Sequence, residues 1–285
     1  MDTKTILLDV GGTFIKCSDG REIPVDSAGS REAVAASLRL AVGDAQDVAV
    51  AIPGPFDYEN GIFLMKHKFA SVYGESFADL AGAAGRRFRF AHDVVAMLLG
   101  EMASGAGKDF GRVALVTLGT GLGFAMCIDG KVLTNEKGSP LVPVWNIPYR
   151  DGILEDYAAK RGFLRGLDSG ITVKDLAAIA SGSSPVAGTA APACGVSSEE
   201  AAARFAEVGS ILAEALESIL AEYGIECLLF GGQISRSYSL FGPSLEAGLH
   251  SPALRHVGPV SDISGATFNG LRALLFLSDV KRRSY

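Results

Sequence analysis

The sequence has no excess of positive charge and no basic stripe. Its 285 residues carry 26 Lys and Arg against 32 Asp and Glu, which gives a net charge of −6. Proteins bind a nucleic-acid backbone mainly through clustered cations, so this balance argues against a nucleic-acid partner. If the chain binds an anionic nucleotide, local backbone N–H groups must supply the attraction.

The sequence also lacks a long apolar run, a secretory signal and paired cysteines. No uninterrupted apolar segment reaches the roughly 20 residues that span a bilayer, and Met1-Asp2-Thr3-Lys4 leads into a short apolar run. These absences predict no membrane partner and a cytoplasmic location. A cysteine zinc site is not expected, because the cysteines lie far apart and suit reduced, mostly buried thiols: Cys17, Cys127, Cys194 and Cys227.

The sequence does contain alternating strand and helix patterns. Apolar runs at residues 5–10, 47–52 and 113–118 predict buried strands, and a helical period predicts a long helix at 198–223. Shorter helices are expected at residues 30–42, 76–84, 93–103, 153–165, 172–180 and 266–279. The Gly/Ser/Pro/Ala-rich residues 181–195 predict a linker or exposed loop.

Length and a weak internal repeat predict two domains. The prior is about 150 residues per domain, and the opening pattern of strand, glycine turn and strand recurs near residue 113. We expect a first domain of residues 1–112 plus the C-terminal helix at about 266–285, and a second domain of residues 113–265. The class is α/β, with mixed sheets because each domain opens with a β-meander or hairpin.

Two glycine turns carry the main functional signal. They are Asp9-Val10-Gly11-Gly12-Thr13 and Leu118-Gly119-Thr120-Gly121-Leu122-Gly123. Neither has P-loop spacing, and a strand follows each turn where a dinucleotide fingerprint requires a helix. Glycine permits positive φ and, without a Cβ, lets backbone N–H groups approach a phosphate. Each turn alone suits an ordinary hairpin, but together they favour phosphate binding.

Polar residues around these turns suit the same ligand. Thr13 and Thr120 add hydroxyl donors, and Lys16 lies where it can counter phosphate charge. Asp9 stands at a strand end, where a carboxylate can hold Mg²⁺ through water. The sequence therefore predicts ATP and Mg²⁺ as cofactors.

The order of motifs resembles the ROK family of bacterial repressors and sugar kinases, within the sugar kinase/actin/heat-shock-protein superfamily. The two glycine turns resemble its phosphate motifs, and Gly231-Gly232 resembles its adenosine-side turn. His92-Asp93 and the segment Gly152–Ala158 resemble its sugar-side motifs. The resemblance implies an actin-like ATPase fold, in which two ribonuclease H-like domains flank a nucleotide cleft. It also implies a frequent homodimer.

The resemblance further implies the sugar side of the site. Asp93 matches the family's catalytic aspartate, a general base, although a helix N-cap is a second role for it. His92 stands where the family has asparagine; it is either a sugar ligand or a neutral histidine at a strand end. The other implied sugar contacts are Gly54, Pro55, Glu136 and Glu155. Glu136 alternatively carries a solvated loop charge.

The sequence departs from the family at residues 135–145. Glu136 and Gly138 match the family's glutamate and second glycine, but Ser139 replaces its histidine and the zinc-binding cysteines are missing. These departures predict no zinc site and leave the sugar open. Family regulators carry an N-terminal helix-turn-helix, for which the first strand at residue 5 leaves no room.

These features predict an ATP-dependent kinase that phosphorylates a hexose or related sugar, with Asp93 as general base. The alternative is a non-catalytic sugar or nucleotide sensor on the same fold. A third interpretation is an acyl-phosphate enzyme or ATPase of the same superfamily, which the Glu155 segment disfavours.

Overall fold

The computed structural model describes residues 4–167, 170–182 and 195–282. Most of the expected linker at residues 181–195 lies outside these residues, as does Cys194. The chain forms two units. The first comprises Met1–Lys108, Val132–Leu141 and Ser264–Tyr285, and the second comprises Asp109–Lys131 and Val142–Ile263. Residues 132–141 thus group with the first unit, although the sequence placed them in the second domain. In the described part of the chain, no helix is long and apolar enough to cross a bilayer.

The first unit is built on a five-stranded mixed sheet in the order β3-β2-β1-β4-β7. Strands β1, β4 and β7 are parallel, and β2 and β3 complete an antiparallel meander. Its elements are β1 (Thr5–Val10), β2 (Phe14–Cys17), β3 (Glu22–Pro24), α1 (Arg31–Val42), β4 (Asp47–Ile52), β5 (Phe56–Asp57), β6 (Ile62–Phe63), η1 (Ala70–Val72), α2 (Phe77–Leu80), β7 (Arg87–His92), α3 (Asp93–Ser104) and α9 (Ala266–Arg282).

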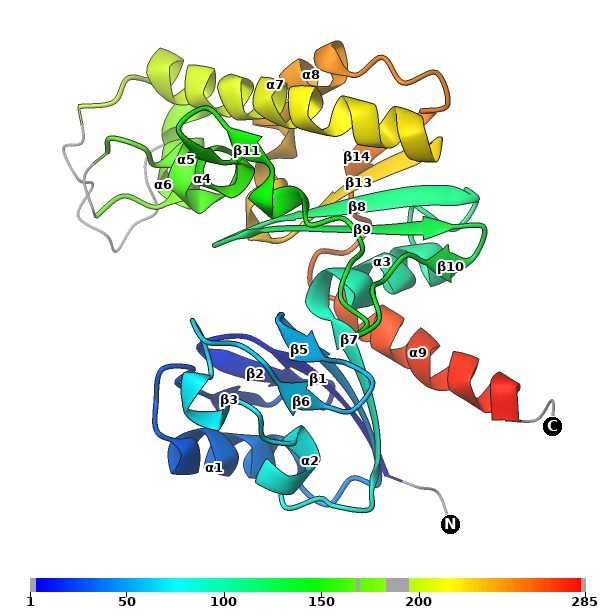
Figure 1. The fold of residues 1–285 in the computed structure, drawn as a ribbon. Coiled ribbons are helices and arrows are strands. Elements are labelled where there is room, and N and C mark those ends of the chain that lie inside the picture. Colours follow the sequence, from blue (N-terminus) through cyan, green and yellow to red (C-terminus); the bar gives the residue numbers. More distant parts are fainter. Residues whose placement is uncertain (1–3, 168–169, 183–194, 283–285) are drawn as a thin grey trace. The chain divides into compact units, whose positions relative to one another are not determined.

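Two glycines allow the C-terminal helix α9 to cross α3 closely within this unit (Figure 1). A Cβ on Gly100 would lie 2.0 Å from the Ala266 carbonyl oxygen, and one on Gly270 would lie 1.7 Å from the Ala96 oxygen. Only glycine fits at such backbone-to-backbone contacts. The last helix is therefore an integral part of the first unit.

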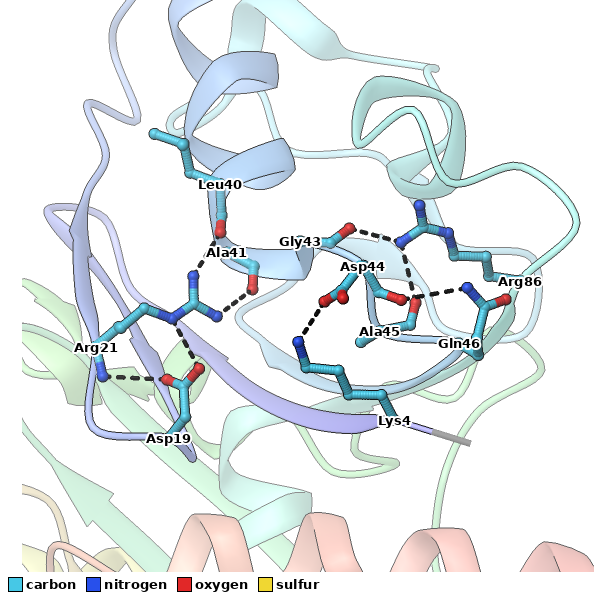
Figure 2. Close-up of polar contacts among 10 residues, drawn as sticks. All are labelled: Lys4, Asp19, Arg21, Leu40, Ala41, Gly43, Asp44, Ala45, Gln46 and Arg86. Carbon is cyan, nitrogen blue, oxygen red and sulfur yellow. Dashed lines mark hydrogen bonds and ion pairs between the residues drawn. The ribbon is translucent and has the colours of Figure 1, made fainter. Parts of the chain in front are cut away.

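Arginine side chains close the C-terminal end of α1, where helix carbonyls lack partners (Figure 2). The Arg21 guanidinium donates to the Leu40 oxygen at 2.6 Å and to the Ala41 oxygen at 3.1 Å. Arg86 donates to the Gly43 oxygen at 2.7 Å. These bonds tie α1 to the β2–β3 turn and to the start of β7, and so brace the sheet that carries the site.

A cluster of aromatic rings supports the loop after β4. Phe56 packs edge-on against Phe63 with ring centroids 5.2 Å apart, and Phe63 stacks on Phe77 at 6.0 Å. All three rings are fully buried. Burial of each such ring contributes about 1.5–3 kcal/mol of stabilisation. The sequence predicted only a loop-rich stretch here, but the rings hold the short β5–β6 hairpin in place.

The second unit repeats the plan of the first, with a sheet in the order β10-β9-β8-β13-β14. Strand β9 is antiparallel to β8, and β8, β13 and β14 are parallel. Its elements are β8 (Arg112–Leu118), β9 (Leu122–Ile128), β10 (Lys131–Val132), η2 (Val144–Asn146), β11 (Pro148–Tyr149), β12 (Gly152–Ile153), α4 (Leu154–Ala158), α5 (Lys160–Phe163), α6 (Val173–Ala180), α7 (Ser198–Tyr223), β13 (Cys227–Gly231), η3 (Gln233–Ser237), α8 (Tyr238–Gly248) and β14 (His256–Pro259).

The helix expected over residues 153–165 is instead two short helices, α4 and α5. Ala159 between them has extended backbone, with φ −108° and ψ −168°. The break allows the Lys160 N–H to donate to the Gly119 oxygen at 3.0 Å. A tertiary contact with the second glycine turn therefore overrides a continuous helical pattern.

Candidate functional site

The parallel strands of the first unit bring three sequence motifs to one sheet edge. Asp9 in β1 pairs in register with Ala51 in β4, and Ile52 pairs with His92 at the end of β7. Carboxyl ends of adjacent parallel strands meet at the same edge, where α/β proteins commonly bind ligands. The edge therefore gathers the first glycine turn, the loop at Gly54 and the pair His92-Asp93.

The first glycine turn presents unused backbone donors. The Gly11 N–H bonds to the Phe14 oxygen at 2.9 Å and closes the turn. Within the described residues, no acceptor pairs with the Gly12 or Thr13 N–H. Thr13 is exposed. The predicted phosphate donors are thus present and accessible.

The reason for glycine in these turns differs from the predicted one. Positive φ is absent at Gly11, Gly12, Gly119 and Gly121. Space is the constraint in the first turn, because a Cβ on Gly11 would lie 3.1 Å from the Phe14 oxygen and one on Gly12 would lie 3.2 Å from Ser27 Oγ. In the second turn an added Cβ is crowded at Gly121 but meets no atom within 4 Å at Gly119. The expectation of left-handed backbone was wrong for these turns.

Asp9 lies in a negative and weakly solvated environment. Burial raises the pKa of its carboxyl from 3.8 to about 6, and the nearby Asp93 carboxylate adds to the rise. Lys16, directly opposite on β2, acts in the other direction. A carboxylate in this setting gains most from an added cation, so the residue fits the predicted Mg²⁺ role.

His92 and Asp93 form a close pair at the start of α3. His92 Nδ1 lies 2.7 Å from Asp93 Oδ1, and the Val94 N–H donates to the same Oδ1 at 2.7 Å. His92 is the N-cap residue and Asp93 the first residue of the helix, so the predicted N-cap role of Asp93 was wrong by one position. The remaining oxygen, Oδ2, has no partner among the described residues.

The Asp93 carboxyl is ionised and accessible. Burial acts to raise its pKa, but the positive charge and hydrogen bond of His92, the Val94 N–H and Lys68 together lower the pKa below its ordinary value. Its side chain is 46% exposed. An exposed carboxylate with one committed oxygen and one open oxygen can accept a proton from a hydroxyl group.

Tyr58 is a site residue that the sequence analysis missed. Its hydroxyl donates to the Ile52 oxygen at 3.0 Å, and its ring lies 5.8 Å from the His92 ring. Gly54 faces both side chains, since a Cβ there would lie 3.3 Å from the Tyr58 hydroxyl and 3.4 Å from His92 Cδ2. No sequence signal marked Tyr58, because it follows the cis Gly54-Pro55 bond in a loop of irregular sequence.

The loop that carries Glu136 docks on Tyr58. The Tyr58 N–H donates to the Lys137 oxygen at 2.9 Å, and Gly138 has φ +80° with its Cα facing Tyr58 Cβ. Glu136 itself is exposed. The segment that departs from the family pattern is thus brought beside the strand-end edge of the first unit.

The second glycine turn belongs to the second unit and is braced by Glu155. Its carboxylate accepts the Leu122 N–H at 2.9 Å, and a Cβ on Gly121 would lie 2.7 Å from the same oxygen. Among described residues, the Thr120 and Gly121 N–H groups have no acceptor. Glu155, predicted as a sugar contact, therefore also shapes the second glycine turn. Gly123 lies in β9, paired with Thr117.

Gly231 and Gly232 stand beside this turn. Gly231 pairs with Thr117 at the end of β13, and Gly232 follows with φ +81°. A Cβ on Gly232 would lie 2.4 Å from the Leu118 oxygen. Both the backbone conformation and the available space require glycine at this position, so the two turns of the second unit form one packed structure.

Comparison with known proteins finds a family model and a curated relative that match parts of the chain. The ROK family model matches residues 31–140. The chain is 28% identical over 261 residues to the glucokinase of Thermotoga maritima, covering 85% of this chain and 74% of that protein. These matches agree with the ROK-family resemblance that the motifs predicted.

Solved structures of the family share the fold. A ROK transcriptional regulator, a homologue of the E. coli MLC protein, matches with TM-score 0.74 and 19% identity over 95% of this chain and 77% of that chain. A Streptomyces griseus glucokinase in complex with glucose and AMPPNP matches with TM-score 0.68 and 20% identity over 94% and 97%. The predicted actin-like ATPase fold with mixed sheets is confirmed.

Proposed function

We propose that this protein transfers the γ-phosphoryl group of ATP to a hydroxyl group of a hexose or related sugar, with Asp93 as general base. The observation that supports it most is the ionised, accessible Asp93 carboxylate at the strand-end edge, beside the first glycine turn. Its relative from T. maritima is a glucokinase, and the S. griseus relative binds glucose and an ATP analogue.

The contacts of Asp93 assign its two oxygens different tasks. Oδ1 is held by His92 Nδ1 and the Val94 N–H, which fixes the carboxylate. Oδ2 would accept the hydroxyl proton while the sugar oxygen bonds to the γ-phosphorus and the bond to the β–γ bridging oxygen breaks. ADP leaves, and the proton passes from Asp93 to solvent. Such a positioned base typically accelerates a reaction by about 10²–10⁴-fold.

Backbone groups would hold the ATP phosphates in this mechanism. In the first unit, the N–H groups of Gly12 and Thr13, which have no acceptor among the described residues, suit phosphate oxygens. In the second unit, the N–H groups of Thr120 and Gly121 suit the same chemistry. Gly231 and Gly232 would line the adenosine side. Mg²⁺, when bound, neutralises phosphate charge, and Asp9 would hold it through water. Lys16 would add positive charge beside the first turn.

The sugar contacts proposed are Gly54, Pro55, His92 and Glu136, with Tyr58 supporting His92 and Gly54. Glu155 Oε2 already accepts the Leu122 N–H, and Oε1 lies 3.7 Å from the Arg161 guanidinium, so a sugar hydroxyl would have to share Oε1 with Arg161. Histidine in place of the family's asparagine offers a single ring nitrogen, Nε2, once Nδ1 faces Asp93. We therefore expect sugar selectivity to differ from that of the relatives.

Nucleotide turnover with a panel of hexoses and amino sugars tests the proposal. Wild type should show sugar-dependent ADP release, and Asp93→Asn should lower kcat by about 10²–10⁴-fold. Asp79→Asn is the matched control, because Asp79 is also an acidic residue in the first turn of a helix in this unit. Sugar or nucleotide binding without turnover would instead favour the sensor. Equal slow ATP hydrolysis by wild type and Asp93→Asn with every sugar would overturn the kinase proposal.

A further inference from the structure

Three arginines line a cavity in the second unit. Its volume is about 90 Å³, and its lining residues belong to α7, the α4–α5 segment and the β11–β12 turn. Figure 1 shows these elements grouped together within that unit. Arg150, Arg165 and Arg204 contribute three positive charges to its lining, and Glu207 is the only acidic residue among the described lining residues. The lining therefore carries net positive charge.

Two of these cations pack on one aromatic ring. The Arg165 guanidinium carbon lies 4.5 Å from the centre of the Tyr157 ring, and that of Arg150 lies 5.3 Å from it. The Tyr157 ring can favour both cations, but their mutual repulsion remains. An anion between them would remove this repulsion.

The arginines keep unused donors. Arg204 donates to the Arg165 oxygen at 2.7 Å and to Glu200 Oε1 at 3.4 Å, yet its buried Nε has no hydrogen-bond partner among the described residues. The guanidinium of Arg165 reaches only the exposed carboxylate of Asp151, at 3.6 Å. Each guanidinium has five N–H donors in a fork that matches oxyanions. A buried donor without a partner destabilises the folded state, so a ligand acceptor would stabilise this site.

Arg150 is held in place by an unusual backbone. It has φ +50°, the left-handed region that non-glycine residues rarely adopt, in the two-residue turn between β11 and β12. Its guanidinium donates to Glu207 at 3.1 Å. The strained turn positions a cation at the cavity, a use for which backbone strain is often retained.

We propose that this cavity binds a phosphate-sized oxyanion: inorganic phosphate or the terminal phosphoryl group of a small phosphorylated metabolite. The cavity has space for several water molecules and hence for one tetrahedral group. Tyr157 in the lining belongs to the Gly152–Ala158 segment, but the residues changed in the test, Arg165 and Glu207, lie outside that segment, the glycine turns and the strand-end edge of the first unit. Failure of this proposal can therefore be distinguished from failure of the kinase proposal.

Calorimetric titration of the full chain with inorganic phosphate, against chloride at equal ionic strength, is the test. Arg165→Gln should weaken phosphate binding by about tenfold or more, because a charged bidentate donor is lost. Arg255→Gln is the matched control, since Arg255 also combines an ion pair, to Glu226, with a ring contact, to Phe110. It should leave the affinity unchanged.

A second variant keeps the test valid if Arg165→Gln unfolds. Glu207→Gln removes this acidic lining residue, keeps an acceptor for Arg150 and should tighten phosphate binding severalfold. Parallel titration with a hexose monophosphate identifies the ligand's source: tighter binding indicates a phosphorylated metabolite, and equal binding indicates free phosphate. Phosphate binding that neither variant alters, or no saturable binding at millimolar phosphate, would overturn the proposal.

Discussion

The two units share one strand order but present different chemistry at their strand ends. In the first unit, the edge carries the titratable side chains of Asp9, His92 and Asp93. In the second, the corresponding turn is lined by backbone groups, and its one nearby carboxylate, Glu155, is bonded to the Leu122 N–H. The same architecture thus supports a reactive edge in one unit and a rigid binding turn in the other.

The two units differ in which residues at their strand ends lower the stability of the fold. The first unit keeps two carboxylates close enough for Asp93 to raise the pKa of Asp9, which opposes folding but suits a cation and a proton acceptor. In the second unit, the Glu155 carboxylate accepts a hydrogen bond from the Leu122 N–H. Gly232 packs so closely against the Leu118 backbone that a Cβ would not fit between them. Substitutions of the strand-end carboxylates in the first unit should therefore lower activity and raise stability. Substitutions in the glycine turns of the second unit should lower both activity and stability.

The largest expected stability effect is a gain from Asp9→Asn. The pKa of Asp9 is raised from 3.8 to about 6 in the folded state, so folding favours the protonated carboxyl. Its penalty is absent below about pH 4, grows as the pH rises and is complete above about pH 6. At pH 7, Asp9→Asn should stabilise the protein by about 3 kcal/mol, at 1.4 kcal/mol per pKa unit.

Urea unfolding of wild type and Asp9→Asn at pH 4, 5, 6 and 7 measures this difference. The exposed Glu59→Gln serves as the control in the same unit. The variant should also lose sugar-dependent turnover, because it lacks the proposed Mg²⁺ ligand. A stability difference that is independent of pH, or that has the opposite sign, would contradict the assigned environment of Asp9.

Gly232→Ala in the second unit should lower the free energy of unfolding by about 2 kcal/mol. Both its φ of +81° and the 2.4 Å approach of a Cβ to the Leu118 oxygen oppose the substitution. Gly130→Ala is the matched control, with φ +79° and no atom within 4 Å of the added Cβ. It should cost about 1 kcal/mol, from backbone conformation alone. If thermal unfolding shows that the two variants lose the same stability, the backbone around Leu118 moves to accept the added Cβ without further cost.

Glu155→Ala should have the smallest effect and decides between two roles. If Glu155 mainly braces the second glycine turn, losing its bond to the Leu122 N–H should raise the KM for ATP by about tenfold. Glu155→Gln keeps an acceptor and should remain close to wild type. A rise confined to the KM for the sugar would show instead the sugar contact that the family resemblance implies.

Local patterns in the sequence predicted the elements that carry the site. The apolar runs at residues 5–10 and 113–118 become β1 and β8 within one residue, because strand and helix periods depend on neighbouring side chains. Helix α8 was not predicted, since Gly242 and Pro243 interrupt its pattern. Two-residue strands such as β5 and β6 leave no period to detect.

The sequence by itself determined the two glycine turns, the position of Asp93 after a strand and the resemblance to the ROK family. Tertiary structure alone decided what those residues touch: Glu155 on the Leu122 N–H, Tyr58 beside Gly54, and three arginines around one cavity. The physical reason is the distance along the chain over which the residues interact. Turns and strand ends follow from residues adjacent in the chain, whereas hydrogen-bond partners and burial depend on segments that only the folded chain brings together.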